Sequence, residues 1–178
     1  RREVLWFYQD GCNRLFPDAY ATFRDVVPVD ERDDMVAAYH RRLTGPDPAV
    51  RLAAARAWST WEARTLSLRN DNTRQQAYAS EAFALAFARI ECHYFHHRGF
   101  LPRDDYLLVN ATALHAIPVT IVHGRYDVVT PLANAWDLKQ VVPHADLRIV
   151  EDSGHAMTEP GITHELIAAT RRLDSGQG

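Results

Sequence analysis

The sequence of 178 residues has little cysteine, no long apolar run and no large excess of either charge. Cys12 and Cys92 are too few and too far apart for a disulfide framework or a zinc knuckle, so two reduced thiols are expected. No apolar run approaches the roughly 18 residues of a membrane span. No signal-like segment opens the chain, which favours a cytoplasmic protein without a membrane partner. The net charge is −3 and Lys and Arg are scattered, so no nucleic-acid partner is indicated.

The sequence also lacks the motif that carries a nucleophilic serine. No Gly-x-Ser-x-Gly stretch and no His-Gly-Gly stretch occurs, so neither a nucleophile elbow nor an oxyanion hole is expected here. Ser153 precedes His155 by two residues but is not on a strand-to-helix turn, and we reject it as a nucleophile. Cys92 is next to His93 in a predicted helix, where adjacent residues do not face each other. The other serines lie in helical, capping or tail contexts: Ser59, Ser67, Ser80 and Ser175.

The first 110 residues are predicted to be mostly helical. Three segments are expected to form helices, each opened by a capping residue or a proline: 31–43 after Asp30, 49–68 after Pro48 and 81–97 after Ser80. The polar stretch 68–76 is read as a loop, and the helix over 81–97 is expected to end near Gly99.

After Pro118 the pattern becomes strand, helix, strand, helix, over residues 119–124, 131–143, 145–152 and 159–173. Pro131 is expected in the first turn of its helix. Alternation with short connections predicts a parallel sheet. Two strands cannot cover their own edges and faces, so this part is expected to be the end of a larger sheet. The chain does not begin with Met, which suggests a processed or fragmentary chain.

Asp127 and His155 follow the two predicted strands. In an open parallel sheet the active groups lie just beyond the carboxyl ends of the strands. Asp127 comes three residues after Gly124, and His155 lies in a glycine-containing loop after the second strand. We therefore expect the two side chains to come within reach of each other. Their order in the chain, acid and then histidine, is that of the triad partners in α/β-hydrolases, where the serine comes first.

Four segments then resemble prolyl aminopeptidase, also called proline iminopeptidase: LWFYQDGCNRLFP, FALAFARIECHYF, IPVTIVHGRYDVVTP and NAWDLKQVVPHADLRIVEDSGHAMTEPGI. The likeness runs through essentially all 178 residues. It implies the α/β-hydrolase fold, with this chain as its C-terminal half. A helical cap is expected over residues 1–110, and the C-terminal part of a mostly parallel core over 111–178. The missing N-terminal half, on the same gene product or a companion chain, would carry the serine and the oxyanion hole.

The resemblance also implies the reaction, which is release of an N-terminal proline from a peptide substrate through an acyl-enzyme. In this reading Asp127 is the triad acid and His155 the general base. No metal and no organic cofactor is implied. Because the serine and the oxyanion hole lie elsewhere, the isolated chain is expected to be catalytically inactive.

An aminopeptidase must hold a protonated imino group, and carboxylates do so through charge-assisted hydrogen bonds. The resemblance makes Glu62 and Glu91 this amine-binding pair. Glu91 is an acid inside an otherwise apolar helix, where an unpaired carboxylate is costly. Trp61 adjoins Glu62 and is expected to provide an aromatic wall of the pocket, and Tyr8, in the run WFY, is a further candidate.

Simpler interpretations stay open. Glu62 alone fits a salt bridge with Arg64, Glu91 alone fits one with an arginine two residues before it, and the aromatic residues fit ordinary packing. The chain also fits another α/β-hydrolase peptidase or esterase, or a non-catalytic binding module derived from one. Some relatives carry cysteine where this chain has Thr130, a change expected to lower sensitivity to thiol reagents without touching the triad.

Overall fold

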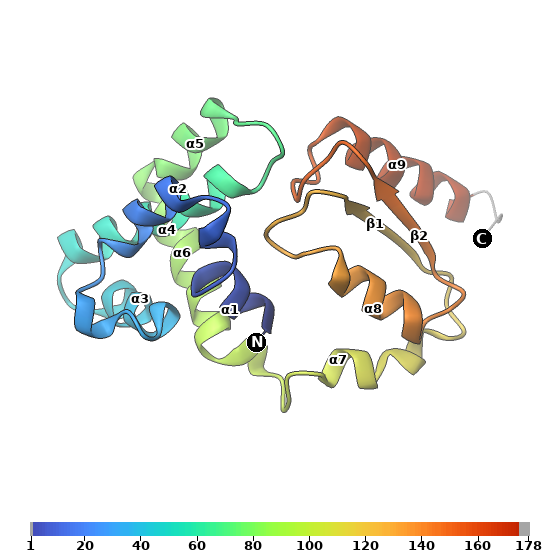
Figure 1. The fold of residues 1–178 in the computed structure, drawn as a ribbon, viewed down its shortest axis with the longest axis horizontal. Helices are drawn as coiled ribbons and strands as arrows, with labels where there is room; N and C mark the ends of the chain where they lie inside the picture. Colours follow the sequence, from blue (N-terminus) through green and yellow to red (C-terminus); the bar gives the residue numbers. More distant parts are fainter. Residues whose placement is uncertain (1, 175–178) are drawn as a thin grey trace. The chain divides into compact units, whose positions relative to one another are not determined.

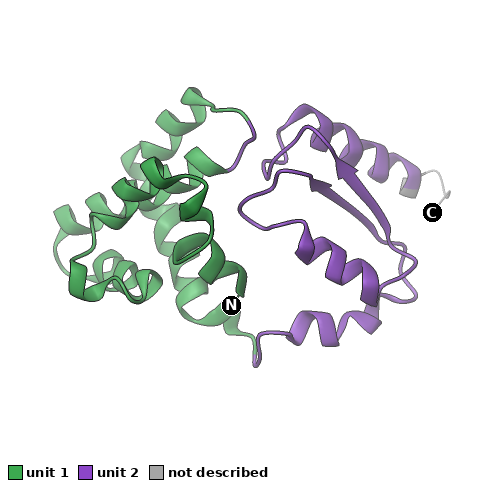
Figure 2. Cartoon of the chain, in the orientation of Figure 1, with its two compact units in different colours: residues 1–65, 69–101 green, residues 66–68, 102–178 purple. Residues whose placement is uncertain are grey.

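The computed structural model describes residues 2–174, so Ser175 lies outside the described residues. The described residues form two compact units (Figure 2). Unit 1 comprises residues 2–65 and 69–101, and unit 2 comprises residues 66–68 and 102–174. No helix of residues 2–174 is long and apolar enough to cross a membrane.

Unit 1 is built from α-helices joined by short turns (Figure 1). The α-helices are α1 Arg2–Tyr8, α2 Pro17–Arg24, α3 Met35–Thr44, α4 Pro48–Thr65, α5 Asn72–Ala79 and α6 Glu81–His96. Short 3₁₀ helices cover Cys12–Arg14, Val29–Glu31 and Arg98–Phe100.

Helix α4 is the centre of unit 1 because it packs against α2, α3, α5 and α6. The carboxylate of Asp47 accepts hydrogen bonds from the N–H groups of Ala49 and Val50, so the free donors of the first turn are capped. Further along the helix, Trp58 and Trp61 are almost fully buried. They pack with Tyr8, Phe23 and other aromatic rings, which are the largest buried side chains of this unit.

Several predicted boundaries in unit 1 were wrong. Asp30 does not cap the third helix. It lies in a 3₁₀ turn, and Asp34 is the cap, accepting a hydrogen bond from the N–H of Ala37 at 3.0 Å. The predicted loop over 68–76 contains the start of α5, which is capped by Asp71. Ser80 precedes α6, but its hydroxyl donates to the carbonyl of Ala77 and does not cap the helix.

Unit 2 contains a parallel pair of strands, β1 Thr120–Gly124 and β2 Asp146–Val150, as predicted. In the register, Thr120 pairs with Asp146 and Gly124 with Val150. The helices of this unit are α7 Tyr106–Val109, a 3₁₀ helix Ala111–Leu114, α8 Ala133–Val141 and α9 Pro160–Asp174.

Helices α8 and α9 lie on opposite sides of the two strands (Figure 1). A small core of Ala111, Val142 and Ala145 packs against Ile121 and Leu138 from β1 and α8. Pro131 comes just before α8 and not within its first turn, because the helix begins at Ala133. The described chain is therefore rich in helix, with a small parallel sheet of two strands.

Candidate active site

The side chains of Asp127 and His155 meet at the carboxyl ends of β1 and β2. Because the strands are parallel and in register from Thr120 to Gly124, the loops that follow them leave the same edge of the sheet. Nδ1 of His155 lies 2.9 Å from Oδ2 of Asp127. The expected proximity of the two residues is thus observed within unit 2.

The carboxylate of Asp127 is fixed by a local turn. Oδ1 accepts hydrogen bonds from the N–H groups of Val129 at 3.0 Å and Thr130 at 2.8 Å, which leaves Oδ2 for His155. Asp127 is 7% exposed. Burial alone would raise the pKa of Asp127, but the hydrogen bond and the charge of His155, with the donors of Thr130, lower it overall. The acid is therefore held ionised beside the histidine.

The contact with Asp127 also fixes the tautomer of His155. A carboxylate oxygen only accepts hydrogen bonds, so Nδ1 of His155 is the donor and Nε2 carries the lone pair. The side chain of His155 is about one-third exposed, whereas that of Asp127 is buried. A neutral imidazole oriented in this way is suited to take a proton at Nε2.

The loop that carries His155 is held by backbone hydrogen bonds within unit 2. The carbonyl of Leu66 accepts from the N–H groups of His155 at 2.9 Å and Ala156 at 2.8 Å. Gly124 permits a close approach of the two strand-end loops, because a Cβ at this position would lie 2.0 Å from the carbonyl oxygen of Gly154. The strand pattern of the sequence predicts that Asp127 and His155 lie close together, and these backbone contacts hold the loops that carry them.

Two further side chains that the sequence analysis did not assign to this site contact Asp127. The hydroxyl of Thr130 donates to Oδ2 of Asp127 at 3.0 Å and lies 3.2 Å from Nδ1 of His155. Nε2 of His123 lies 3.4 Å from the same Oδ2 and donates to the carbonyl of Thr130 at 2.9 Å. Thr130, at the position where some relatives carry cysteine, thus contacts both residues through its hydroxyl while the contact between Asp127 and His155 is kept.

In unit 1, Glu62 forms a buried pair with Tyr8. The hydroxyl of Tyr8 donates a short hydrogen bond to Oε1 of Glu62, and the two residues are 2% and 3% exposed. Burial, followed by the charge of Glu91, raises the pKa of Glu62 well above its usual value, although the hydrogen bond from Tyr8 opposes this. Burial, Glu62 and Glu91 likewise raise the pKa of Tyr8. The raised pKa of Glu62 favours either a proton on its carboxyl group or a cation beside it.

Glu91 is connected to the same group of side chains through Trp58. Nε1 of Trp58 donates to Oε2 of Glu91 at 2.7 Å. The ring of Trp58 stacks on that of Tyr8, with centroids 4.3 Å apart and planes at 22°. Glu62 and Glu91 are thus each bonded to one ring of a stacked aromatic pair.

Trp61 packs within the aromatic core of unit 1, where its ring lies 5.2 Å from that of Phe7 and 5.3 Å from that of Tyr20. Its Nε1 is buried and has no hydrogen-bond partner among residues 2–174. Arg64 pairs with Asp18 at 2.6 Å, so it is not the partner that the simpler interpretation gave to Glu62.

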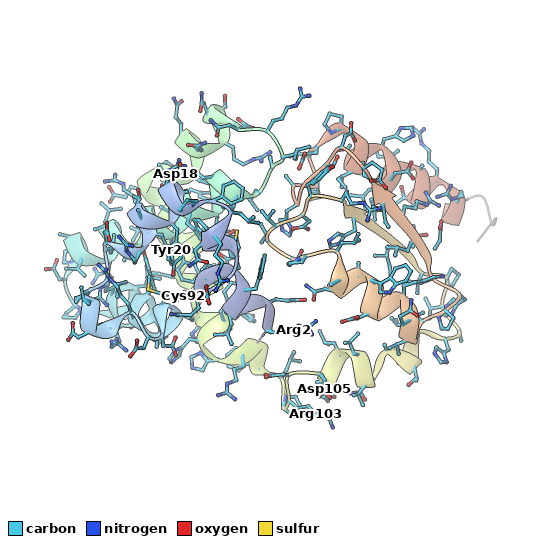
Figure 3. All side chains as sticks on the ribbon, in the orientation of Figure 1. Arg2, Asp18, Tyr20, Cys92, Arg103 and Asp105 are labelled. Carbon is cyan, nitrogen blue, oxygen red and sulfur yellow. The ribbon has the colours of Figure 1, made fainter. Side chains whose placement is uncertain are left out.

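Cys92 and Ser153, which the sequence analysis rejected as nucleophiles, are both buried. Burial, followed by the charge of Glu91, raises the pKa of Cys92 to about 12. Its thiol donates to the carbonyl of Val36 at 3.5 Å. Cys92 belongs to α6 of unit 1 (Figure 3). A thiol in this state is inert. Ser153 is 2% exposed and lies in the loop after β2, away from any strand-to-helix elbow.

The predicted site residues thus form two groups, each within its own unit. Asp127 and His155 are in contact in unit 2, while Tyr8, Glu62 and Glu91 are linked through Trp58 in unit 1.

Comparison with known proteins confirms the resemblance to proline iminopeptidases, although no family model matches the chain. The chain is 51% identical over 173 residues to a probable proline iminopeptidase of Leptolyngbya boryana. The aligned region covers 97% of this chain and 54% of that protein. It is 45% identical over 179 residues to the proline iminopeptidase of Arabidopsis thaliana, with 100% and 47% covered. The corresponding protein of Xylella fastidiosa strain Temecula1 is 50% identical over 170 residues, with 96% and 54% covered. The chain matches their C-terminal portion and spans about half the length of these curated relatives.

Proposed function

We propose that this chain, which matches the C-terminal portion of proline iminopeptidases, belongs to a serine peptidase that releases N-terminal proline from peptides through an acyl-enzyme. Asp127 is the acid and His155 the general base of its triad. The observation that carries this proposal is the 2.9 Å contact between Nδ1 of His155 and Oδ2 of Asp127 at the ends of two parallel strands.

In this mechanism Asp127 keeps Nδ1 of His155 protonated and stabilises the imidazolium that forms when Nε2 takes the proton of a serine hydroxyl. His155 then returns that proton to the leaving amine. The hydroxyl of Thr130 assists by donating to the same oxygen of Asp127 that faces His155. The lowered pKa of Asp127 supports this role because the acid stays ionised through the cycle.

Glu62 and Glu91 recognise the protonated imino group of the substrate in this proposal. The raised pKa of Glu62 means that its charge is poorly compensated in the unliganded protein. A cationic imino group provides that compensation, so binding draws the proton off Glu62 and forms a charge-assisted hydrogen bond. Tyr8 and Trp58 hold the two carboxylates in position, and Trp61 contributes an aromatic wall and a buried N–H donor.

The proposed fold of the whole enzyme is that of an α/β-hydrolase. Residues 1–110 form its helical cap and residues 111–178 the C-terminal part of its core sheet. The nucleophilic serine and the oxyanion hole belong to an N-terminal half, on the same gene product or a companion chain. The 178 residues alone are then inactive, because no Gly-x-Ser-x-Gly motif occurs among them.

The test measures hydrolysis of proline anilide by the full-length protein. Asp127→Asn should lower kcat by about 10⁴-fold, since the histidine loses its correct tautomer. Asp152→Asn is the matched control, because it removes an exposed carboxylate from the loop of His155 and should leave kcat unchanged. Equal activity of Asp127→Asn and the wild type would refute the role of Asp127. The isolated 178 residues should not hydrolyse proline anilide. If they do, and Ser153→Ala abolishes that activity, the proposal that the nucleophilic serine lies outside these residues is refuted.

A second measurement separates an aminopeptidase from an esterase of the same fold. Glu62→Gln and Glu91→Gln should weaken hydrolysis of proline anilide, while hydrolysis of an ester without an amine should change little. Equal effects on both substrates would contradict amine recognition by these two carboxylates.

A further inference from the structure

Three histidines of unit 1 bring their ring nitrogens together. His40 lies in α3, His93 in the last turn of α6 and His97 directly after α6. One ring nitrogen from each lies within 4.8 Å of the other two. The ring centroids are 4.4 Å apart for His93 and His97, 5.8 Å for His40 and His97, and 6.3 Å for His40 and His93.

The local structure explains this convergence. His93 and His97 are four residues apart, which places both on one face of a helix. Helix α3 packs against α6 and brings His40 opposite them. Nδ1 of His97 lies 2.8 Å from the carbonyl oxygen of His93. A carbonyl only accepts, so Nδ1 of His97 carries the proton and Nε2 carries the lone pair that a metal ion needs. Metal-binding histidines are commonly fixed by such a bond at the other ring nitrogen.

The turn after α6 supports the same rings. Arg98, Gly99 and Phe100 all have positive φ, at 55°, 62° and 57°. A left-handed conformation at a residue as large as Phe100 is rare and is kept only where the surroundings impose it. This turn stacks Phe100 on His97, with centroids 5.2 Å apart and planes at 9°, and places it 5.6 Å from His93. Phe100 therefore packs on one side of the His93 and His97 imidazoles, and both residues stay exposed.

We propose that His40, His93 and His97 bind a divalent transition-metal ion of the borderline class, Zn²⁺, Ni²⁺ or Cu²⁺. Three imidazoles suit these ions, whereas Mg²⁺ and Ca²⁺ prefer oxygen ligands. Zn–N bonds of about 2.0–2.1 Å in tetrahedral geometry place the nitrogens roughly 3.4 Å apart. His93 and His97 are exposed, so their rings can turn inward by the small distance required. A fourth position remains for water.

The role of the ion follows from the elements that it joins. His40 belongs to α3, whereas His93 and His97 come from α6 and its end, so the ion crosslinks two packed helices of unit 1. An ion that binds only the folded state stabilises that state. The site is separate from the proposed triad and does not depend on the peptidase assignment.

The test uses the full-length protein, produced without a histidine tag and freed of metal by a chelator. Zn²⁺ is added alone, and binding is measured by titration calorimetry and by the thermal unfolding of unit 1. At a Zn²⁺ concentration 100-fold above the dissociation constant, the melting temperature of a unit of this size should rise by about 10–20 °C. His93→Gln and His97→Gln should each weaken Zn²⁺ binding by at least about tenfold and shrink the shift. Both residues are exposed, so the metal-free melting temperatures should match the wild type.

His96→Gln provides the matched control. His96 belongs to the same helix and is exposed, but it stacks face to face on His40 at 4.0 Å and is outside the set of converging nitrogens. Its substitution should leave Zn²⁺ affinity close to that of the wild type. The proposal is overturned if His93→Gln and His97→Gln bind Zn²⁺ as tightly as the wild type, or if His96→Gln loses as much affinity as they do.

Discussion

The buried carboxyl group of Glu62 predicts an unusual dependence of stability on pH. Its pKa in the folded protein lies well above the ordinary value of 4.5. Folding therefore takes up a proton at pH values between the unfolded and the folded pKa. The stability that depends on this proton is fully present below about pH 4.5 and declines as the pH rises towards the folded pKa.

The substitution Glu62→Gln removes the titrating group but keeps an oxygen that can accept from Tyr8. One proton taken up on folding changes the free energy of unfolding by about 1.4 kcal/mol per pH unit. Between pH 5 and pH 7 the free energy of unfolding of the wild type should thus fall by up to about 2.7 kcal/mol relative to that of Glu62→Gln. The variant therefore becomes more stable relative to the wild type as the pH rises. Glu91→Gln should reduce the loss, since the charge of Glu91 raises the pKa of Glu62.

The assay is urea unfolding at pH 5, 6 and 7, followed by the fluorescence of the buried Trp58 and Trp61 in unit 1. Glu31→Gln serves as the control. Hydrogen bonds from Arg42 and Arg41 lower the pKa of Glu31 to about 2, so its titration falls below this pH range. If the stability difference between Glu62→Gln and the wild type stays constant from pH 5 to pH 7, the buried-carboxyl reasoning is refuted.

Three further substitutions test individual contacts. Thr130→Val should lower the free energy of unfolding by about 1.5–3 kcal/mol near neutral pH, because it removes a donor to Asp127. The pKa of Asp127 should rise. Acid unfolding measures this, and Thr130→Ser should restore the wild-type curve. Asp34→Ala should cost about 0.5–2 kcal/mol in urea unfolding through loss of the α3 cap, and an unchanged midpoint would show that the cap is dispensable. Gly124→Ala should lower the free energy of unfolding by roughly 1–3 kcal/mol, because its Cβ would lie 2.0 Å from the carbonyl oxygen of Gly154. An unchanged melting temperature would contradict that close approach.

The sequence predicts those features of the fold that depend on local pattern. The alternation of strands and helices after Pro118 predicts the parallel pair β1 and β2, and parallel strands bring Asp127 and His155 to one edge. The helix α5 was missed because its residues are polar and bury no apolar face. The signal that could have identified it is Asp71, which caps the helix by accepting from the N–H of Arg74.

Contacts between distant parts of the chain were not predictable in the same way. Tyr8 and Glu62 are 54 residues apart, and Trp58 and Glu91 are 33 apart, so no spacing in the sequence pairs them. His123 belongs to β1, where a strand residue is expected to pack and not to approach the acid. Its contact with Asp127 depends on how the loop after β1 turns back, which is a property of the folded backbone.

The segment Leu66–Leu68 has a consequence for any dissection of the chain. The polypeptide leaves unit 1 after Thr65, returns to it after Leu68 and enters unit 2 again after Leu101. A fragment that starts at residue 102 would contain both strands, Asp127 and His155, yet it would lack the carbonyl of Leu66 that accepts from the backbone of His155. One cut at residue 102 therefore separates the loop that carries His155 from Leu66, the residue whose backbone holds that loop.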